Sequence, residues 1–251
     1  MPARFAITPG TLLRGRISYS QFLQGYRTGL EPVLMAAAVP ARTGQHVLEI
    51  GCGAGAGLLC LLHRIPTIHG TGVEKESDTA ALAQQNMAAN QQQNIRILNA
   101  TFPDVFLADT PQPEQYFDHC MANPPWHAPL GTASAHPRRD LARRMGADTL
   151  PTWIAGAARI LRHKGSLTLA LPAALADQAI FCLSKAGFGG VTLYPFWPKA
   201  GRESRIVLVQ ARKGVKSPAR VLAGLVLHEA DGAFTPTART VLEEGAPLPG
   251  L

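Results

Sequence analysis

The sequence predicts an α/β fold in which helices cover both faces of a mostly parallel sheet. From residue 47 onward, short β-rich apolar runs alternate with longer helical stretches, a rhythm typical of strand–helix–strand units. The first run leads into a glycine-rich segment, Gly51 to Gly57, of the kind that turns a strand into a helix. The last two runs are joined by a segment too short for a crossover helix, so they should form an antiparallel hairpin.

Seven strands and four main helices follow from these patterns. The predicted strands are His46–Ile50, His69–Glu74, Ile95–Asn99, Phe117–Ala122, Ser166–Leu171, Val191–Trp197 and Arg205–Arg212. The predicted helices are Gly57–Arg64, Asp78–Asn90, Leu150–Leu161 and Ala173–Ala186, the second with Ser77 or Asp78 as its N-cap. A further strand is expected in Arg220–Leu227.

The chain is expected to form one domain with a short preface. Residues 1–45 contain polar and aromatic positions followed by an apolar helix from about Glu31 to Val39, and they should pack near the functional site. Residues 46–251 hold the alternating pattern and should form the domain itself. At 251 residues, 46% of them hydrophobic and 16% charged, the chain has enough apolar material for a core and is not expected to be disordered.

Net charge and the spacing of the cysteines indicate which partners, metals and cellular compartment to expect. The formal net charge of +7 would attract a polyanion, although many proteins with such a charge bind none. Cys52, Cys60, Cys120 and Cys182 are scattered without a metal-ligand spacing, so we expect free thiols in a reducing compartment and no metal. Without an apolar leader or a run long enough to span a membrane, the protein is expected to be cytoplasmic.

The glycine-rich segment has the composition of a nucleotide-binding loop. It reads Glu49-Ile50-Gly51-Cys52-Gly53-Ala54-Gly55, and the next strand ends at Glu74, whose carboxylate could accept both hydroxyl protons of a ribose. The spacing of Gly51, Gly53 and Ala56 matches a dinucleotide fingerprint, and the same glycines look like the first motif of S-adenosylmethionine (SAM) methyltransferases. The loop alone does not separate these two cofactors.

The tetrad Asn123-Pro124-Pro125-Trp126 follows the fourth predicted strand and favours methyl transfer. The exocyclic amine of adenine is a poor nucleophile because its lone pair is delocalised into the ring. Two acceptors, the Asn123 amide oxygen and the Pro124 carbonyl, would localise that pair, and Trp126 would stack on the base. A plain Pro-Pro turn with a core tryptophan is the alternative, but a hydride-transfer enzyme would have no use for this tetrad beside a glycine loop.

Taken together, these motifs make the chain resemble the tRNA(Val) adenine-37 N6-methyltransferase-like family of bacterial class I methyltransferases. The resemblance also covers Gln24 to Gly29 and Arg138 to Arg143. It implies a Rossmann-like class I methyltransferase fold and SAM as cofactor. It further implies cofactor-binding residues Glu49, Gly51, Gly53, Gly55, Glu74, Thr101 and Asn123, and catalytic residues Asn123, Pro124, Pro125 and Trp126. Thr101 stands where the family usually has an acidic residue, and Trp126 replaces the commoner tyrosine.

Basic residues near the tetrad suggest a nucleic-acid substrate. Arg138, Arg139 and Arg143 could contact a phosphate backbone, and Tyr26 and Arg27 could close over the cofactor or stack on RNA. Residues 199–220 hold seven basic residues and one acid, a local charge of +6. The alternative for both clusters is solvated surface.

The sequence therefore predicts a SAM-dependent N6-adenine methyltransferase that acts on RNA, most readily tRNA, as a monomer or homodimer. The alternatives are a protein glutamine N5-methyltransferase, a DNA adenine methyltransferase, and a catalytically silent SAM-binding or RNA-binding protein. The first usually carries a separate helical domain and the second a target-recognition domain, and neither is evident here.

Overall fold

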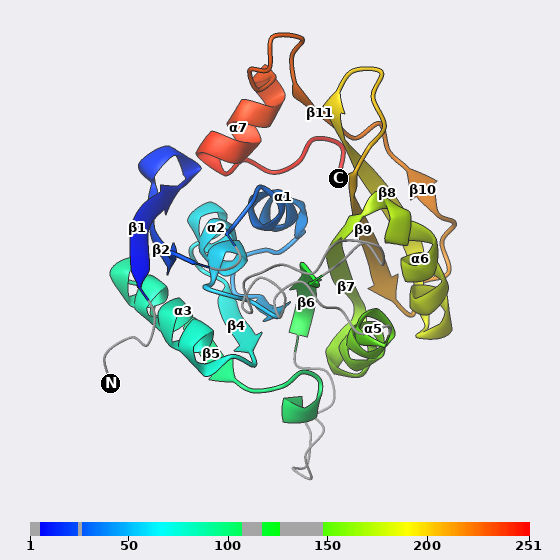
Figure 1. The fold of residues 1–251 in the computed structure, drawn as a ribbon. Coiled ribbons are helices and arrows are strands. Elements are labelled where there is room, and N and C mark those ends of the chain that lie inside the picture. The colour runs from blue at the N-terminus through cyan, green and yellow to red at the C-terminus, as the bar shows by residue number, and fades with distance from the viewer. Residues whose placement is uncertain (1–5, 25–26, 107–116, 126–147) are drawn as a thin grey trace.

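The computed structural model describes residues 6–24, 27–106, 117–125 and 148–251, and these form a layered α/β structure (Figure 1). The main sheet has nine strands, in the order β10-β8-β9-β7-β6-β3-β4-β5 with β11 paired to β8. Its strands are β3 (His46–Ile50), β4 (His69–Glu74), β5 (Ile95–Asn99), β6 (Phe117–Ala122), β7 (Leu161–Pro172), β8 (Phe188–Lys199), β9 (Ile206–Lys213), β10 (Arg220–Val221) and β11 (Leu225–His228). All pairings are parallel except those of β9, which runs antiparallel to both β7 and β8.

Helices cover both faces of this sheet, as predicted. The α-helices are α1 (Glu31–Ala38), α2 (Ala56–Arg64), α3 (Ser77–Ala89), α5 (Thr149–Ile160), α6 (Ala176–Lys185) and α7 (Pro236–Glu244), with short 3-10 turns at Leu13–Gly15, Asp104–Phe106 and Ala173–Leu175. Side chains of α1, α2 and α7 form one buried cluster with the sheet, and those of α5 and α6 form the other. The sheet therefore lies between two cores.

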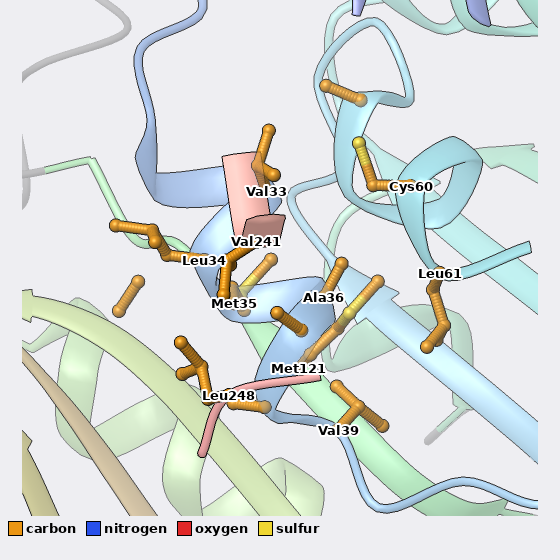
Figure 2. Close-up of a cluster of buried hydrophobic side chains, with 14 of the residues drawn as sticks. Val33, Leu34, Met35, Ala36, Val39, Cys60, Leu61, Met121, Val241 and Leu248 are labelled. Atoms are coloured by element: carbon orange, nitrogen blue, oxygen red, sulfur yellow. The ribbon is translucent and has the colours of Figure 1, made fainter. Parts of the chain in front are cut away.

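Strand β6 shows how one sequence serves both cores. Met121 joins the cluster of α1 and α2, whereas its neighbours Cys120 and Ala122 join the cluster of α5 and α6. This alternation follows from the two-residue period of a strand, and it explains why Cys120, Met121 and Ala122 are all apolar. Figure 2 shows Met121 among the side chains of α1, including Met35 and Ala36.

The seven predicted strands and five predicted helices are all present, and the antiparallel pairing of β8 with β9 is confirmed. The predicted strand count of seven was too low, because Arg220–Leu227 splits into β10 and β11. The predicted N-cap of α3 was also wrong. Glu76 holds the cap position, and its side chain makes no capping hydrogen bond.

The preface contains a β-hairpin that the sequence reading missed. Strands β1 (Ile7–Leu12) and β2 (Ile17–Phe22) pair antiparallel in a separate two-stranded sheet. Two asparagines, Asn86 of α3 and Asn90 at its C-cap, dock this hairpin by pairing their amides with its backbone. Asn90 bonds the N–H and C=O of Ser18, and Asn86 bonds the N–H and C=O of Ser20, at 2.7–3.0 Å. The preface thus packs on the domain.

Candidate functional site

The register of the sheet brings the predicted site residues into one row. Ile50 of β3 pairs with Ala122 of β6 on one side and with Val73 of β4 on the other. The residues that follow these three, Gly51, Asn123 and Glu74, therefore leave adjacent strands at the same edge, at spacings of about 4.8 Å. We call this the carboxyl edge. Strand order reverses between β3 and β6, the point where open α/β sheets bind ligands.

The glycine loop requires glycine at three positions. Gly51, Gly53 and Gly55 have φ values of 66°, 55° and 89°, a region that other residues rarely adopt. A Cβ on Gly51 would also lie 2.6 Å from the ring of Trp153. Gly55 is the N-cap of α2, so the loop leads directly into that helix. The loop thus presents backbone, rather than side chains, at the carboxyl edge.

Glu74 lies at the end of β4 and holds the loop in place. Its Oε2 accepts a hydrogen bond from the Gly53 N–H at 3.0 Å, and its Oε1 accepts one from the Glu76 N–H at 2.9 Å. Burial raises the pKa of this carboxyl group, although both hydrogen bonds oppose the shift. Asn99 of β5 in turn donates to the carbonyls of Glu74 and Lys75.

Glu49 lies beneath the loop and supports it from inside. The side chain is 3% exposed, and its Oε2 accepts a hydrogen bond from the Leu58 N–H in the first turn of α2. A Cβ on Gly57 would lie 2.3 Å from the Glu49 carboxylate, so glycine at that position makes room for it. Burial raises the pKa of Glu49 to about 8. Direct contact of Glu49 with a cofactor stays a prediction.

Asn123 is the unusual polar group of the site. Its amide oxygen is buried and has no hydrogen-bond partner among the described residues. Buried polar atoms are almost always paired, so an orphaned acceptor at a strand end indicates a missing donor. Pro124 next to it is buried, and Pro125 is half-buried. These three residues complete the row beside the glycine loop.

Three further residues were not singled out from the sequence. Trp153 of α5 lies against Gly51. Asn86 of α3 is 2% exposed and donates to the carbonyl of Ala54 in the loop, besides its bonds to the hairpin. Glu31 begins α1, and its Oε2 is buried without a partner among the described residues. Only the Glu31 position had a sequence signal, a carboxylate at the start of an otherwise apolar helix.

The other predicted site residues are placed as follows. Thr101 follows β5 at the carboxyl edge and is exposed, and Arg27 is exposed ahead of α1. Strand β2 fixes the chain beside Arg27, because Gln21 accepts a bond from the Thr28 N–H and Tyr19 bonds the Thr28 hydroxyl at 2.8 Å. Tyr26, Trp126, Arg138, Arg139 and Arg143 lie outside the described residues.

The expectation of free thiols is confirmed. All four cysteines are free thiols. No group of three or more potential metal ligands occurs among the described residues. None of the described helices is both long enough and apolar enough to cross a membrane.

Comparison with known proteins identifies the family. Residues 32–192 match the family model described as the methyltransferase small domain, which spans the glycine loop, Glu74 and Asn123. The chain belongs to this family. Among curated relatives, proteins from Aeromonas hydrophila and Proteus mirabilis are 27% and 26% identical to it. Both are named tRNA1(Val) (adenine(37)-N6)-methyltransferase, and the matches cover 83% and 89% of this chain and 85% and 90% of theirs.

Solved structures confirm the class I methyltransferase fold. A protein from Agrobacterium tumefaciens described as a predicted O-methyltransferase matches with a TM-score of 0.69 at 22% identity, covering 86% of this chain and 96% of that one. A 16S rRNA N2 methyltransferase from T. thermophilus, solved with AdoMet and guanosine, matches with a TM-score of 0.56 at 18% identity, covering 83% of this chain and 50% of that one. The methyltransferase fold expected from the glycine loop and the tetrad is thus confirmed.

Proposed function

We propose that this methyltransferase transfers a methyl group from SAM to N6 of an adenine in tRNA. The observation that carries the proposal is the buried amide oxygen of Asn123, which has no partner among the described residues and lies adjacent to the glycine loop. Leaving a buried acceptor unpaired costs about 1–3 kcal/mol, so the residue is suited to a ligand that brings an N–H group. The curated relatives support an adenine amine in tRNA as that group.

The residues at the carboxyl edge fit SAM as the cofactor. Each oxygen of Glu74 carries one backbone hydrogen bond, which leaves lone pairs for the two hydroxyl groups of a ribose. Gly51 and Gly53 would allow the cofactor to approach the backbone closely, and Thr101 would lie beside its adenine. When bound, SAM supplies an electrophilic methyl group.

The chain's own residues would prepare the amine. In the proposed arrangement, the Asn123 oxygen and the Pro124 carbonyl accept the two N–H groups of the exocyclic amine, which turns its lone pair toward the methyl group. Pro124 and Pro125 have fixed φ angles, so the carbonyl needs little reorganisation. Trp126 would stack on the flipped base, and Tyr26, Arg27, Arg138, Arg139 and Arg143 would contact RNA.

The test is methyl transfer with defined acceptors. Purified protein is incubated with tritiated SAM and tRNA from a strain that lacks the gene, followed by mass spectrometry of the digested nucleosides. We expect label in tRNA as N6-methyladenosine. Duplex DNA and a glutamine-containing protein extract serve as competing acceptors, and label in either of them instead would contradict the proposed substrate. SAM binding without label in any acceptor would indicate a silent binding protein.

A further inference from the structure

The fold divides the cations of residues 199–220 between opposite edges of the sheet. Ile206 at the start of β9 pairs with Pro172 at the end of β7, so the turn between β8 and β9 lies at the carboxyl edge. At the other end of β9, Arg212 pairs with Ser166 near the start of β7, and Lys213 pairs with Phe188 at the start of β8. These residues lie at the edge where the parallel strands begin, opposite the edge that holds Asn123. We call it the amino edge.

The cations of the carboxyl edge lie beside acidic residues. Lys199 pairs with His228 of β11, and its ammonium group donates to the carbonyl of Ala230 at 2.7 Å. Two exposed acids, Glu229 and Asp231, flank Ala230. Together with Glu203 they balance the three cations of this turn, which are Lys199, Arg202 and Arg205. The cations that give residues 199–220 a local charge of +6 therefore do not form a single surface patch.

The amino edge instead gathers cations from three separate stretches of the chain, at residues 42, 162–164 and 212–216. Lys213 donates to the carbonyl of Leu161 at 2.7 Å, which joins the end of β9 to the start of β7. A Cβ on Gly214 would lie 2.6 Å from His163, so the next loop also packs there. We call the following six residues the basic edge: Arg42, Arg162, Lys164, Arg212, Lys213 and Lys216.

Among the described acids, Asp118 alone forms an ion pair with one of these six cations. Asp118 accepts from Arg162 at 2.8 Å and from the His46 N–H at 2.8 Å. Arg42, Lys164, Arg212 and Lys216 are exposed and form no ion pair with any described acid. The positive field also reaches inward, because Arg212 and Arg42 add to burial in lowering the pKa of His119. Crowded like charges destabilise a folded chain unless a polyanion neutralises them.

We propose that the basic edge binds the phosphate backbone of the same RNA whose adenine enters the carboxyl edge. The two edges are separated by strands of five or six residues, roughly 20 Å at about 3.3 Å per residue. A protein module can follow double-stranded RNA over about 16 base pairs, so one structured RNA is large enough to reach both edges. This inference rests on the proposed function for the identity of the polyanion.

The test compares two variants with the same change in charge. The first carries Lys164→Gln, Arg212→Gln and Lys216→Gln on the basic edge. The control carries Arg202→Gln, Arg205→Gln and Arg239→Gln, which removes three exposed cations elsewhere. Affinity for fluorescent tRNA is measured by anisotropy without SAM, between about 50 and 200 mM salt. Each lost phosphate contact should lower the slope of log K against log salt by about 0.7–0.9.

We expect the basic-edge variant to lose about two units of slope and to bind tRNA at least about tenfold more weakly at 100 mM salt. Its melting temperature should stay the same or rise, since like-charge repulsion is relieved. The control should change the slope by less than one unit. Equal losses in both variants, or unchanged binding in the first, would overturn the proposal. So would binding of the wild type to phosphatidylglycerol vesicles but not to tRNA.

Methyl transfer separates this inference from the proposed function. At saturating tRNA the basic-edge variant should keep the wild-type kcat, with the loss confined to KM. If tRNA is methylated but the variant binds it normally, the basic edge is wrong and the proposed function stands. If the variant loses tRNA binding but the wild type methylates no RNA, the proposed function fails and the polyanion surface stands.

Discussion

At the carboxyl edge the amide oxygen of Asn123 is buried without a described partner, whereas at the amino edge the imidazole of His119 has a partner on each nitrogen. His119 Nδ1 lies 2.7 Å from the Ser166 hydroxyl, and Nε2 lies 3.0 Å from the Gln45 amide oxygen, which also accepts from the Arg42 N–H. Asn123 keeps hydrogen-bonding capacity for a ligand, whereas His119 uses its capacity within the protein. This difference separates residues that serve activity from residues that serve stability.

The largest effect is expected for Asn123→Ala. Removing the proposed acceptor should lower kcat by about 10²- to 10³-fold, the loss typical of a polar group that acts on the transition state. Because the oxygen has no described partner to lose, and its removal relieves an unpaired buried acceptor, the melting temperature should not fall. Tritium transfer and thermal unfolding measure the two quantities. If the variant were destabilised yet active, Asn123 would serve stability rather than activity, contrary to the comparison with His119.

A smaller effect on cofactor binding is expected for Asn86→Ala, with Asn90→Ala as its matched control. Both asparagines dock the hairpin, but only Asn86 also holds the Ala54 carbonyl of the glycine loop. We therefore expect a several-fold rise in the dissociation constant for SAM in Asn86→Ala and almost none in Asn90→Ala. Calorimetry checks this result. Similar losses in both would show that the hairpin, and not the bond to the loop, controls cofactor affinity.

At the amino edge, Ser166→Ala should affect stability and spare activity. The variant leaves His119 Nδ1 buried without a partner, at a cost of about 1–3 kcal/mol in the free energy of unfolding. Urea unfolding measures this change, and methyl transfer by the folded variant should match the wild type. A loss of kcat without a loss of stability would place Ser166 in the reaction and remove the distinction between the edges.

The remaining expected effects are opposite dependences of stability on pH. Burial, reinforced by Arg212 and Arg42 against the opposing charge of Asp118, lowers the pKa of His119 from 6.5 to about 4. The folded state thus binds fewer protons than the unfolded state in this window, so stability falls as pH falls from 6.5 toward 4. For Glu49 the pKa rises from 4.5 to about 8, so its contribution falls as pH rises through that window.

Two variants test these signs by thermal unfolding across pH. His119→Gln should flatten the acid side of the stability profile, and Glu49→Gln should flatten the decline between pH 4.5 and 8. Glutamine retains an oxygen that can accept from the Leu58 N–H, which limits other changes at residue 49. Profiles identical to the wild type in both variants would show that neither group titrates as the structure indicates.

The sequence predicted the sheet well because its central strands are buried on both faces. Val47, Leu48 and Ile50 of β3 and Cys120 to Ala122 of β6 are buried apolar residues, and such dense apolar runs are hard to mistake. The hairpin β1–β2 was missed because β1 is mostly exposed, with threonine, proline and glycine at its centre. Its stability depends on Asn86 and Asn90, which are 64 or more positions away from β2 and carry no local signal.

The site was predictable only where it follows strand ends. Gly51, Glu74 and Asn123 could be aligned because parallel strands end at one edge. Trp153 and Asn86 reach the loop through helix packing, which spacing does not reveal. The interpretation of residues 199–220 as one basic cluster was wrong for a related reason. The hairpin of β8 and β9 places residues that are close in sequence at opposite edges of the sheet.

The thiol of Cys52 can report on opening of the glycine loop. It lies beneath Gly72, where an added Cβ would come within 2.7 Å of the sulfur, and it is 4% exposed. Burial raises its pKa well above the ordinary value, so the closed loop keeps it protonated and unreactive. Alkylation of Cys52 would therefore count transient openings of the loop, and a molecule seated on the loop would slow that labelling without touching the sulfur.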